Sequence, residues 1–530
     1  MSKTVKVGFG AAFVLVALAV VTPPLRGQMI DRTQAPNAIN DGIAKSLTDQ
    51  IGTGRGDWNT PGSSSFLIAR DPYRAVRRGR EIFQRKFTRV QLQGPAFQDG
   101  LGDIDTALAI GAGLSDSCAG CHGRPRGSAG GGGDVVTRPD SRDAVHLFGL
   151  GLKEMLADEI TARLRQIRAD AVASAQSRGR SVTRALVAKG IDFGSVTASP
   201  NGSVDTTGVR GVDSDLRVRP FFAHGGTISI REFVVGALHA EVGLDSADPD
   251  LAQASGGGRV TTPAGMVLDG SLDRIESPPI PNPGFDPNGN VSGNEVPTAL
   301  VVYLEYYLLN YFKPATYKQT PSTRHGLRTF KQIGCASCHI SDLAIDRDRR
   351  IADVETVYDA EHGNPLNALY ATATPLFDVV PDGSGQPPLK RPRLQSFLVK
   401  NIFTDFKRHD LGPNFWERNW DGTFQKEFLT RPLWGIGTKA AFGHDGRSVN
   451  VTEVILRHGN EAQAARDAFA DLDADRQREV LDFLGSLVLF PPDDTASNLD
   501  PGDRSNPLYP QVGHGSIKLT TLFNDPSDRE

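Results

Sequence analysis

The amino-acid sequence predicts a mainly α-helical protein whose two domains are related by internal duplication and carry loop-rich insertions. Two observations predict this fold class. All four cysteines belong to two copies of the pattern C-x-x-C-H, at residues 118–122 and 335–339. The segments that follow these copies, 222–235 and 442–456, also resemble each other. Self-similarity over such distances indicates that one structural plan occurs twice in the chain.

The repeat holds in residue types and in spacing. Residues 222–226 read F-A-H-G-G and residues 442–446 read F-G-H-D-G, and a Glu with an apolar trio follows each of them. The His of this turn lies 102 positions after the His of the first C-x-x-C-H and 105 positions after that of the second. A G-x-x-x-F pattern precedes each motif, at 79–83 and 326–330. We therefore expect two mostly helical units with one ancestor.

Composition and charge are those of a globular protein with many loops. Hydrophobic residues make up 39% of the 530 and charged residues 23%, and the net charge of −4 offers no basic face for nucleic acid. Apolar residues at helical spacing predict surface helices in 157–189 and a helix that starts after Asp473. A Pro/Gly/Asn-rich connection at 286–295 separates the halves, and we place the domains at 28–315 and 316–530.

The N-terminus has the plan of an export signal. Lys3 and Lys6 precede a run from Val7 to Val21 that has no charged side chain. A membrane span takes about 20 residues, so this run is short for an anchor. We expect residues 1–27 to be a cleaved signal peptide and the mature protein to be soluble and periplasmic or otherwise exported. Because no A-x-A cleavage site is visible, an uncleaved anchor stays open.

The C-x-x-C-H pattern is that of covalent c-type haem, which needs two thiols for its vinyl groups and an adjacent His for its iron. A disulfide within each pair would not require the His twice, and a shared zinc site would bring the pairs within about 15 to 20 residues. A thioredoxin-like motif would need a βαβ context, and none is apparent. The sequence therefore predicts two cytochrome c-like haem domains. Their haem-binding residues are Cys118, Cys121 and His122, and Cys335, Cys338 and His339.

Function depends on the sixth iron ligand, because a haem with two protein ligands passes electrons whereas one with an open face binds peroxide or dioxygen. Beyond the extreme N-terminus the methionines are Met155 and Met266, so histidine is the more available donor. His458 lies 14 positions after the His of the second turn, and its counterpart in the first half is Ala237. His458 is therefore a candidate ligand of the second haem, with a structural hydrogen-bonding role as the alternative.

Two other histidines keep the first haem's ligand set open. His239 lies two positions beyond Ala237, so a small shift in the alignment would supply a donor there. His146, which lies 24 positions after His122, is a further candidate.

The second half resembles a known family. Residues 431–437 (R-P-L-W-G-I-G), 442–447 (F-G-H-D-G-R) and 458–462 (H-G-N-E-A) are similar to the signature of the di-haem oxidoreductases, which are related to the bacterial di-haem cytochrome c peroxidases. Residues 408–413 (R-H-D-L-G-P) also match, and the resemblance extends over nearly all of the mature chain. In the peroxidases a Met stands where this chain has His458, so the resemblance implies a lower potential for that haem.

The resemblance also implies roles for individual residues. The family's first half ends in E-M-G, whose Glu is the acid/base beside the peroxide-binding haem, and Glu241 occupies that place here. Trp434 is a candidate for an aromatic residue between the two haems. The peroxidases bind calcium through a Thr and a Pro, where this chain has Lys439 and Ala441, so calcium is doubtful.

The function that the resemblance implies is that of an exported di-haem enzyme of peroxidase type. The N-terminal haem would bind the oxidant and the C-terminal haem would relay electrons. The expected partners are hydrogen peroxide or dioxygen and a small redox protein. Two alternatives stay open: the same scaffold acting as a di-haem oxygenase or as an oxidase of a partner protein, and a plain electron carrier with both irons six-coordinate. The sequence predicts no oligomeric state.

Overall fold

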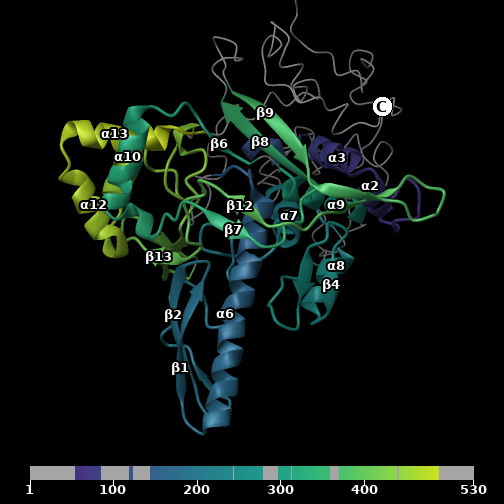
Figure 1. Ribbon diagram of the computed structural model, residues 1–530, viewed down its shortest axis with the longest axis horizontal. Coiled ribbons are helices and arrows are strands. Elements are labelled where there is room, and N and C mark those ends of the chain that lie inside the picture. Colours follow the sequence, from purple (N-terminus) through teal and green to yellow (C-terminus); the bar gives the residue numbers. More distant parts are fainter. Residues whose placement is uncertain are drawn as a thin grey trace, which may run out of the picture.

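The computed structural model describes residues 54–84, 118–122, 144–242, 244–246, 248–278, 296–311, 313–358, 369–419, 421–438 and 441–488. They form a body of helices and short strands from which a long helix and a β-hairpin project as an arm (Figure 1). The predicted signal segment and Lys439 lie outside the described residues, and so does the side chain of Cys121. Within the described part, no helix has the length and apolarity to cross a membrane.

Two helices cross closely in the first half of the chain. α3 (Pro72–Gln84), which follows α2 (Ser64–Arg70), packs against α9 (Thr298–Leu309). A Cβ on Gly79 would lie 2.1 Å from the carbonyl oxygen of Tyr303, so only glycine permits this crossing. α9 is buried along nearly its whole length and lies at the centre of the main core.

A second pair of helices crosses in the same way. α10 (Pro321–Gln332) packs against α13 (Ala474–Gly485), and a Cβ on Gly326 would lie 1.8 Å from the Glu479 carbonyl oxygen. The Asp473 side chain caps α13, which confirms the helix predicted to start there. The G-x-x-x-F segments of the sequence thus have the same local role, because each presents its glycine to a crossing helix.

The repeated turns also lead into helices that begin alike. α7 (Ile230–Ala237) has Ser229 at its N-cap and α11 (Val451–Arg457) has Asn450, and each cap accepts from the backbone N–H of the glutamate three positions later. Each glutamate carboxylate in turn accepts from a backbone N–H just ahead of its helix. These hydrogen bonds run in both directions across the first turn, and they fix where both helices start.

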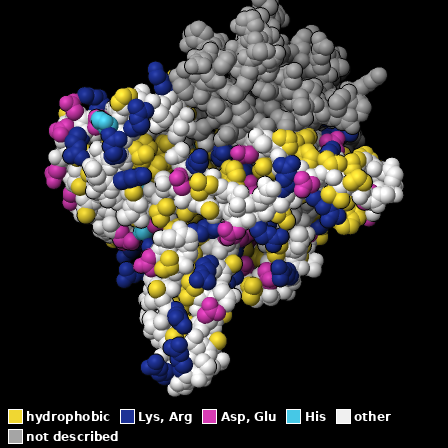
Figure 2. All heavy atoms as spheres, in the orientation of Figure 1, with side chains coloured by type: hydrophobic (Ala, Val, Ile, Leu, Met, Phe, Trp, Pro, Cys, Tyr) yellow, Lys and Arg dark blue, Asp and Glu magenta, His cyan; other side chains and the backbone are white. Residues whose placement is uncertain are grey.

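The arm is built from α6 (Leu150–Arg178) and a sheet of β1 (Val182–Ala188), β2 (Ile191–Ala198) and β3 (Val204–Asp205). The two residues between β1 and β2 have φ of 48° and 79°, which is the backbone of a tight hairpin turn. Basic side chains gather at the free end of the arm (Figure 2).

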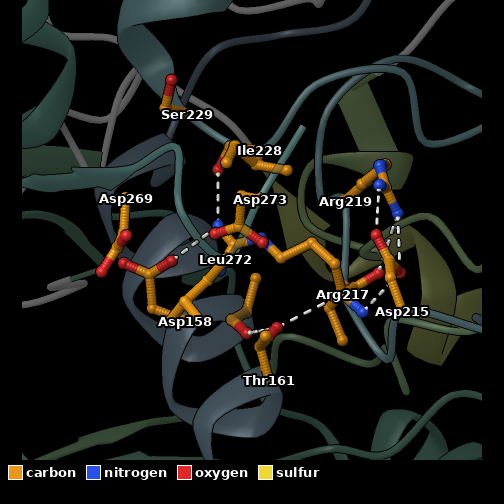
Figure 3. Close-up of polar contacts among 12 residues, drawn as sticks. Asp158, Thr161, Asp215, Arg217, Arg219, Ile228, Ser229, Asp269, Leu272 and Asp273 are labelled. Carbon is orange, nitrogen blue, oxygen red and sulfur yellow. Dashed lines mark hydrogen bonds and ion pairs between the residues drawn. The ribbon is translucent and has the colours of Figure 1, made fainter. Parts of the chain in front are cut away.

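Arg217 fastens the segment before α7 to α6 (Figure 3). Its guanidinium lies 2.8 Å from Asp158 of α6 and donates to the Ile228 carbonyl oxygen at 3.4 Å. The next residue, Val218, donates its N–H to the Thr161 hydroxyl at 3.0 Å. These contacts fix the segment that leads into α7 against α6.

The prediction of a mainly α fold made of two cytochrome c-like domains is wrong, because the described residues form a mixed structure with one three-stranded and seven two-stranded sheets. Helices were predicted through residues 157–189, but α6 ends at Arg178 and a strand begins at Val182. Most of the other strands have only two to four residues, which is too short to show alternation in the sequence.

The two-stranded sheets pair β4 (Arg259–Thr261) with β5 (Val267–Asp269), β6 (Ala315–Thr316) with β17 (Leu487–Val488), β7 (Leu343–Ile345) with β12 (Phe397–Val399), β8 (Ala352–Tyr358) with β9 (Leu369–Pro375), β10 (Phe377–Val380) with β11 (Leu389–Pro392), β13 (Arg408–Asp410) with β16 (Glu427–Leu429), and β14 (Glu417–Arg418) with β15 (Phe424–Gln425). The other helical segments are α5 (Cys118–His122), η2 (Leu238–Val242), α8 (Pro249–Ser255), η3 (Cys335–Ser337), η4 (Ile436–Thr438), η5 (Asn460–Ala462) and α12 (Gln463–Ala470). The predicted domain boundary after residue 315 falls inside β6.

Candidate haem-binding sites

In the second half, the C-x-x-C-H motif forms η3 and the residues directly after it. The Nδ1 atom of His339 lies 3.0 Å from the carbonyl oxygen of Phe403. Because a carbonyl only accepts, Nδ1 carries the proton and Nε2 is the nitrogen that would ligate iron. Desolvation lowers the pKa of His339, which keeps the imidazole neutral as a metal ligand must be.

His458 lies close to this histidine, at the end of α11. Its Nδ1 atom donates to the Val454 carbonyl oxygen at 2.7 Å, so its proton is also on Nδ1. Desolvation lowers the pKa of His458 to about 4, and the electrostatic interaction with His339 acts in the same direction. The ring of Phe415 meets His458 edge-on, with centroids 5.2 Å apart. The structure thus brings together two neutral imidazoles, each with Nε2 as its remaining donor.

A third histidine of this half, His409, was not singled out from the sequence. Its Nε2 lies 2.9 Å from Asp405 and its Nδ1 lies 2.8 Å from Glu461. Desolvation lowers the pKa of His409, but the interactions with Asp405 and Cys338 outweigh it and raise the pKa to about 11. Cys338, Asp405 and His409 could in principle hold a metal ion. Because both ring nitrogens already face carboxylates, the cluster is better described as an imidazolium beside the thiol of the motif.

In the first half, α5 carries the motif, and its histidine is oriented in the same way. The Nδ1 atom of His122 donates to the Val145 carbonyl oxygen at 2.6 Å. The ring of Phe233, on α7, meets the His122 ring edge-on with centroids 6.4 Å apart. Both motifs therefore present a paired thiol pattern with a histidine whose Nδ1 is anchored by backbone, and this donor set fits a c-type haem.

Glu241 lies in η2, a π-helical turn that continues directly from α7. Its side chain is half-buried, whereas Leu238 and Val242 of the same turn are buried and fix it to the core. Single π-turns within helices are frequent at functional sites. His239 in the same turn is exposed, and its Nδ1 lies 2.7 Å from Asp245. The structure thus places Glu241 on the segment that carries Phe233.

Trp434 lies where the two halves meet. Its side chain is 4% exposed, and a Cβ on Gly149 would lie 2.4 Å from its ring. Its carbonyl oxygen accepts from Nε2 of His146 at 2.9 Å, although the two residues are 288 positions apart. The Nδ1 atom of His146 accepts from the N–H of Phe148 at 3.2 Å. Both ring nitrogens of His146 are therefore engaged, which argues against this residue as an iron ligand.

The methionines are placed away from a ligand role. Met155 and Met266 are both buried in the main core. The Sδ atom of Met155 lies 3.2 Å from the backbone N of Arg349. The Sδ atom of Met266 lies 3.8 Å from the guanidinium of the same arginine. These contacts favour histidine over methionine as the second ligand.

A further internal repeat was missed in the sequence. Residues 147–151 read L-F-G-L-G and residues 433–437 read L-W-G-I-G, so both combine Leu, an aromatic residue and two glycines. A Cβ on Gly151 would lie 2.2 Å from the last carbonyl of α9, and one on Gly437 would lie 2.1 Å from the last carbonyl of α13. The shared G-x-G pattern could have revealed this repeat in the sequence. Its distance from the preceding C-x-x-C-H motif, however, differs greatly between the two halves.

Comparison with known proteins supports the resemblance for the second half. Residues 341–487 match the family described as "Di-haem oxidoreductase, putative peroxidase". The match begins just after the second motif and includes Trp434 and His458. A solved structure of hydrazine synthase from Kuenenia stuttgartiensis, pressurised with 20 bar xenon, is similar with 14% identity and a TM-score of 0.22. The likeness covers 39% of this chain and 59% of that chain. No curated protein matches the chain.

Proposed function

We propose, from the premise that residues 341–487 belong to the di-haem oxidoreductase family, that this protein is a peroxidase-type enzyme with two covalent c-type haems. A haem iron exchanges electrons when both axial positions hold protein ligands, and it binds peroxide when one position is open. The residues that would hold the two haems are Cys118, Cys121 and His122 in the first half, and Cys335, Cys338, His339 and His458 in the second.

The single observation that carries this proposal is the difference between the two sites at one equivalent position. In the second half, α11 ends at His458, a neutral imidazole beside His339. In the first half, Ser229 caps α7 as Asn450 caps α11, but the residue equivalent to His458 is Ala237, whose side chain has no donor atom. The second site therefore has the residues for a six-coordinate haem, and the first site is the one at which an oxidant would bind.

Glu241 is the proposed acid/base of the first site. Cleavage of an O–O bond requires a group that takes a proton from one oxygen and returns it to the other. Glu241 has a half-buried carboxylate on the segment that continues from α7, whose Phe233 faces His122. His239 of the same turn is more exposed than Glu241, so Glu241 is the better shielded proton carrier.

The proposal includes export to the periplasm and reduction by a small redox protein. Export rests on the apolar N-terminal run after Lys3 and Lys6. Trp434 is proposed as the aromatic residue between the sites, since it is buried where the halves meet.

The test is electron paramagnetic resonance of the oxidised holoprotein together with peroxide turnover. We expect one high-spin and one low-spin ferric centre in the native protein. His458→Ala should convert the low-spin centre to high-spin, whereas His325→Ala, a control at an exposed histidine, should leave both signals unchanged. If the native protein shows no high-spin signal, binds no cyanide and turns over no peroxide, the proposed function is wrong and a plain electron carrier is the better description.

A further inference from the structure

The two loops that share the L-aromatic-G-x-G pattern face each other across the junction of the two halves. The first loop (residues 147–151) and the second loop (433–437) each have their first glycine in the left-handed region, with φ of 69° at Gly149 and 76° at Gly435. The ring of Trp434 packs directly on Gly149, where a Cβ would lie 2.4 Å from it. A side chain at this position would push the loops apart.

A hydrogen bond from His146 fastens the first loop to the second. The Phe148 N–H can only donate, so Nδ1 of His146 must be the acceptor and the ring proton must be on Nε2. That Nε2–H donates to the Trp434 carbonyl oxygen at 2.9 Å. The imidazole is therefore held in one tautomer and in one orientation between two backbone groups.

Each loop is joined to the backbone carbonyl that orients a haem-site histidine. Val145, next to His146, supplies the oxygen that accepts from Nδ1 of His122 at 2.6 Å. On the other side, the N–H of Leu433 donates to the Ile402 carbonyl at 3.1 Å. The next carbonyl along, that of Phe403, accepts from His339. A continuous run of backbone and hydrogen bonds thus links the two proximal histidines through His146.

We propose that His146 is a positioning residue that sets the reduction potential of the N-terminal haem. By anchoring its neighbour Val145 to the second half, it holds the Val145 carbonyl in hydrogen-bonding distance of His122. A hydrogen bond from Nδ1–H to a fixed acceptor makes the imidazole a stronger base at Nε2, and a more basic ligand stabilises ferric iron. The inference rests on the haem assignment proposed above, but it does not depend on the enzyme's substrate.

The test is a redox titration of the holoprotein followed by electron paramagnetic resonance, which reports each ferric centre separately. His146→Phe keeps a ring of similar size but removes the donor and the acceptor. We expect the reduction potential of the N-terminal haem to rise, with a change on the order of tenfold in the ferric-to-ferrous ratio. Loss of a hydrogen-bonding partner of a metal ligand typically changes metal affinity or activity about 10- to 100-fold, and we take the lower end. For a one-electron couple this is about 59 mV. His146→Gln keeps an amide donor and should restore most of the native value.

Each of the following results would overturn the inference. His146→Phe could leave the N-terminal potential unchanged with both haems still bound, or lower it. His146→Gln could shift it as much as the Phe variant does, which would deny the hydrogen bond its role. A role confined to stability would lower the unfolding temperature without moving the potential.

Gly149→Ala, which separates the loops from the other side, should raise the potential of the N-terminal haem as His146→Phe does. Absence of peroxide turnover would defeat the proposed function while leaving this comparison intact.

Discussion

Replacing Gly326 by alanine tests the helix crossing on which the second site is built. The added Cβ would lie 1.8 Å from the Glu479 carbonyl oxygen and 2.9 Å from Cβ of Phe483. Close C···O contacts in proteins are about 3.3 Å or longer, so α10 and α13 must separate by roughly 1.5 Å at this point. Overpacking of this kind costs about 1–3 kcal/mol, and a clash with backbone belongs at the upper end.

Alanine also favours helix over glycine by about 1 kcal/mol, which offsets part of this cost. We therefore expect Gly326→Ala to lower the free energy of unfolding by about 2 kcal/mol. Gly485→Ala is the matched control, because it lies in the partner helix α13 and its Cβ would meet nothing within 4 Å. That variant should be neutral or stabilised by up to about 1 kcal/mol.

The assay is urea unfolding of the holoprotein, followed by circular dichroism and by the haem absorbance. The crossing also supports the site itself, because Phe330 on α10 has its ring 5.3 Å from Phe483 and 6.1 Å from His339. Gly326→Ala should therefore alter the low-spin signal as well as stability. If both alanine variants are equally stable, or if Gly326→Ala is the more stable one, the crossing is not as tight as the structure indicates.

Two further predictions concern a buried ion network and the proposed acid/base. Arg231→Met leaves the buried carboxylates of Asp248 and Glu305 without their common cation, so we expect a loss of about 3–5 kcal/mol in thermal or urea unfolding. The same change at exposed Arg478 should cost less than about 1 kcal/mol, and equal losses would contradict the assignment. Glu241→Gln should slow peroxide turnover about 100-fold or more in stopped-flow measurements, with both haem spectra unchanged. A loss of less than tenfold would remove Glu241 from this role.

Local signals in the sequence were sufficient for several parts of the structure. The N-caps at Asp473, Ser229 and Asn450 each accept from a backbone N–H three positions later, so these hydrogen bonds can be predicted from the chain itself. The pairing of His122 and His339 with cysteines is equally local. What these signals share is that the interacting groups lie within one turn of each other.

The features that could not be predicted depend on groups far apart in the sequence. The helical spacing that continues to Lys189 predicts a helix after Arg178, whereas tertiary packing places Val182 in a strand. The hydrogen bond between His146 and the Trp434 carbonyl joins residues 288 positions apart and uses a backbone acceptor, which leaves no mark on residue type. The second carboxylate at His409 is likewise distant, because Glu461 lies 52 positions further along the chain.

α7 and α11 are equivalent helices, and the residues at their C-terminal ends account for their different roles in the proposed function. In the second half Gly459 follows His458, and its N–H donates to the Leu411 carbonyl, so α11 ends and leaves the imidazole at its terminus. In the first half α7 runs to Ala237, and Leu238 continues the chain directly into the π-turn η2. The chain then carries its next functional group four residues further on, at Glu241. In the proposed function, the second half thus offers an imidazole where its helix ends, and the first half offers a carboxylate on the turn that continues its helix.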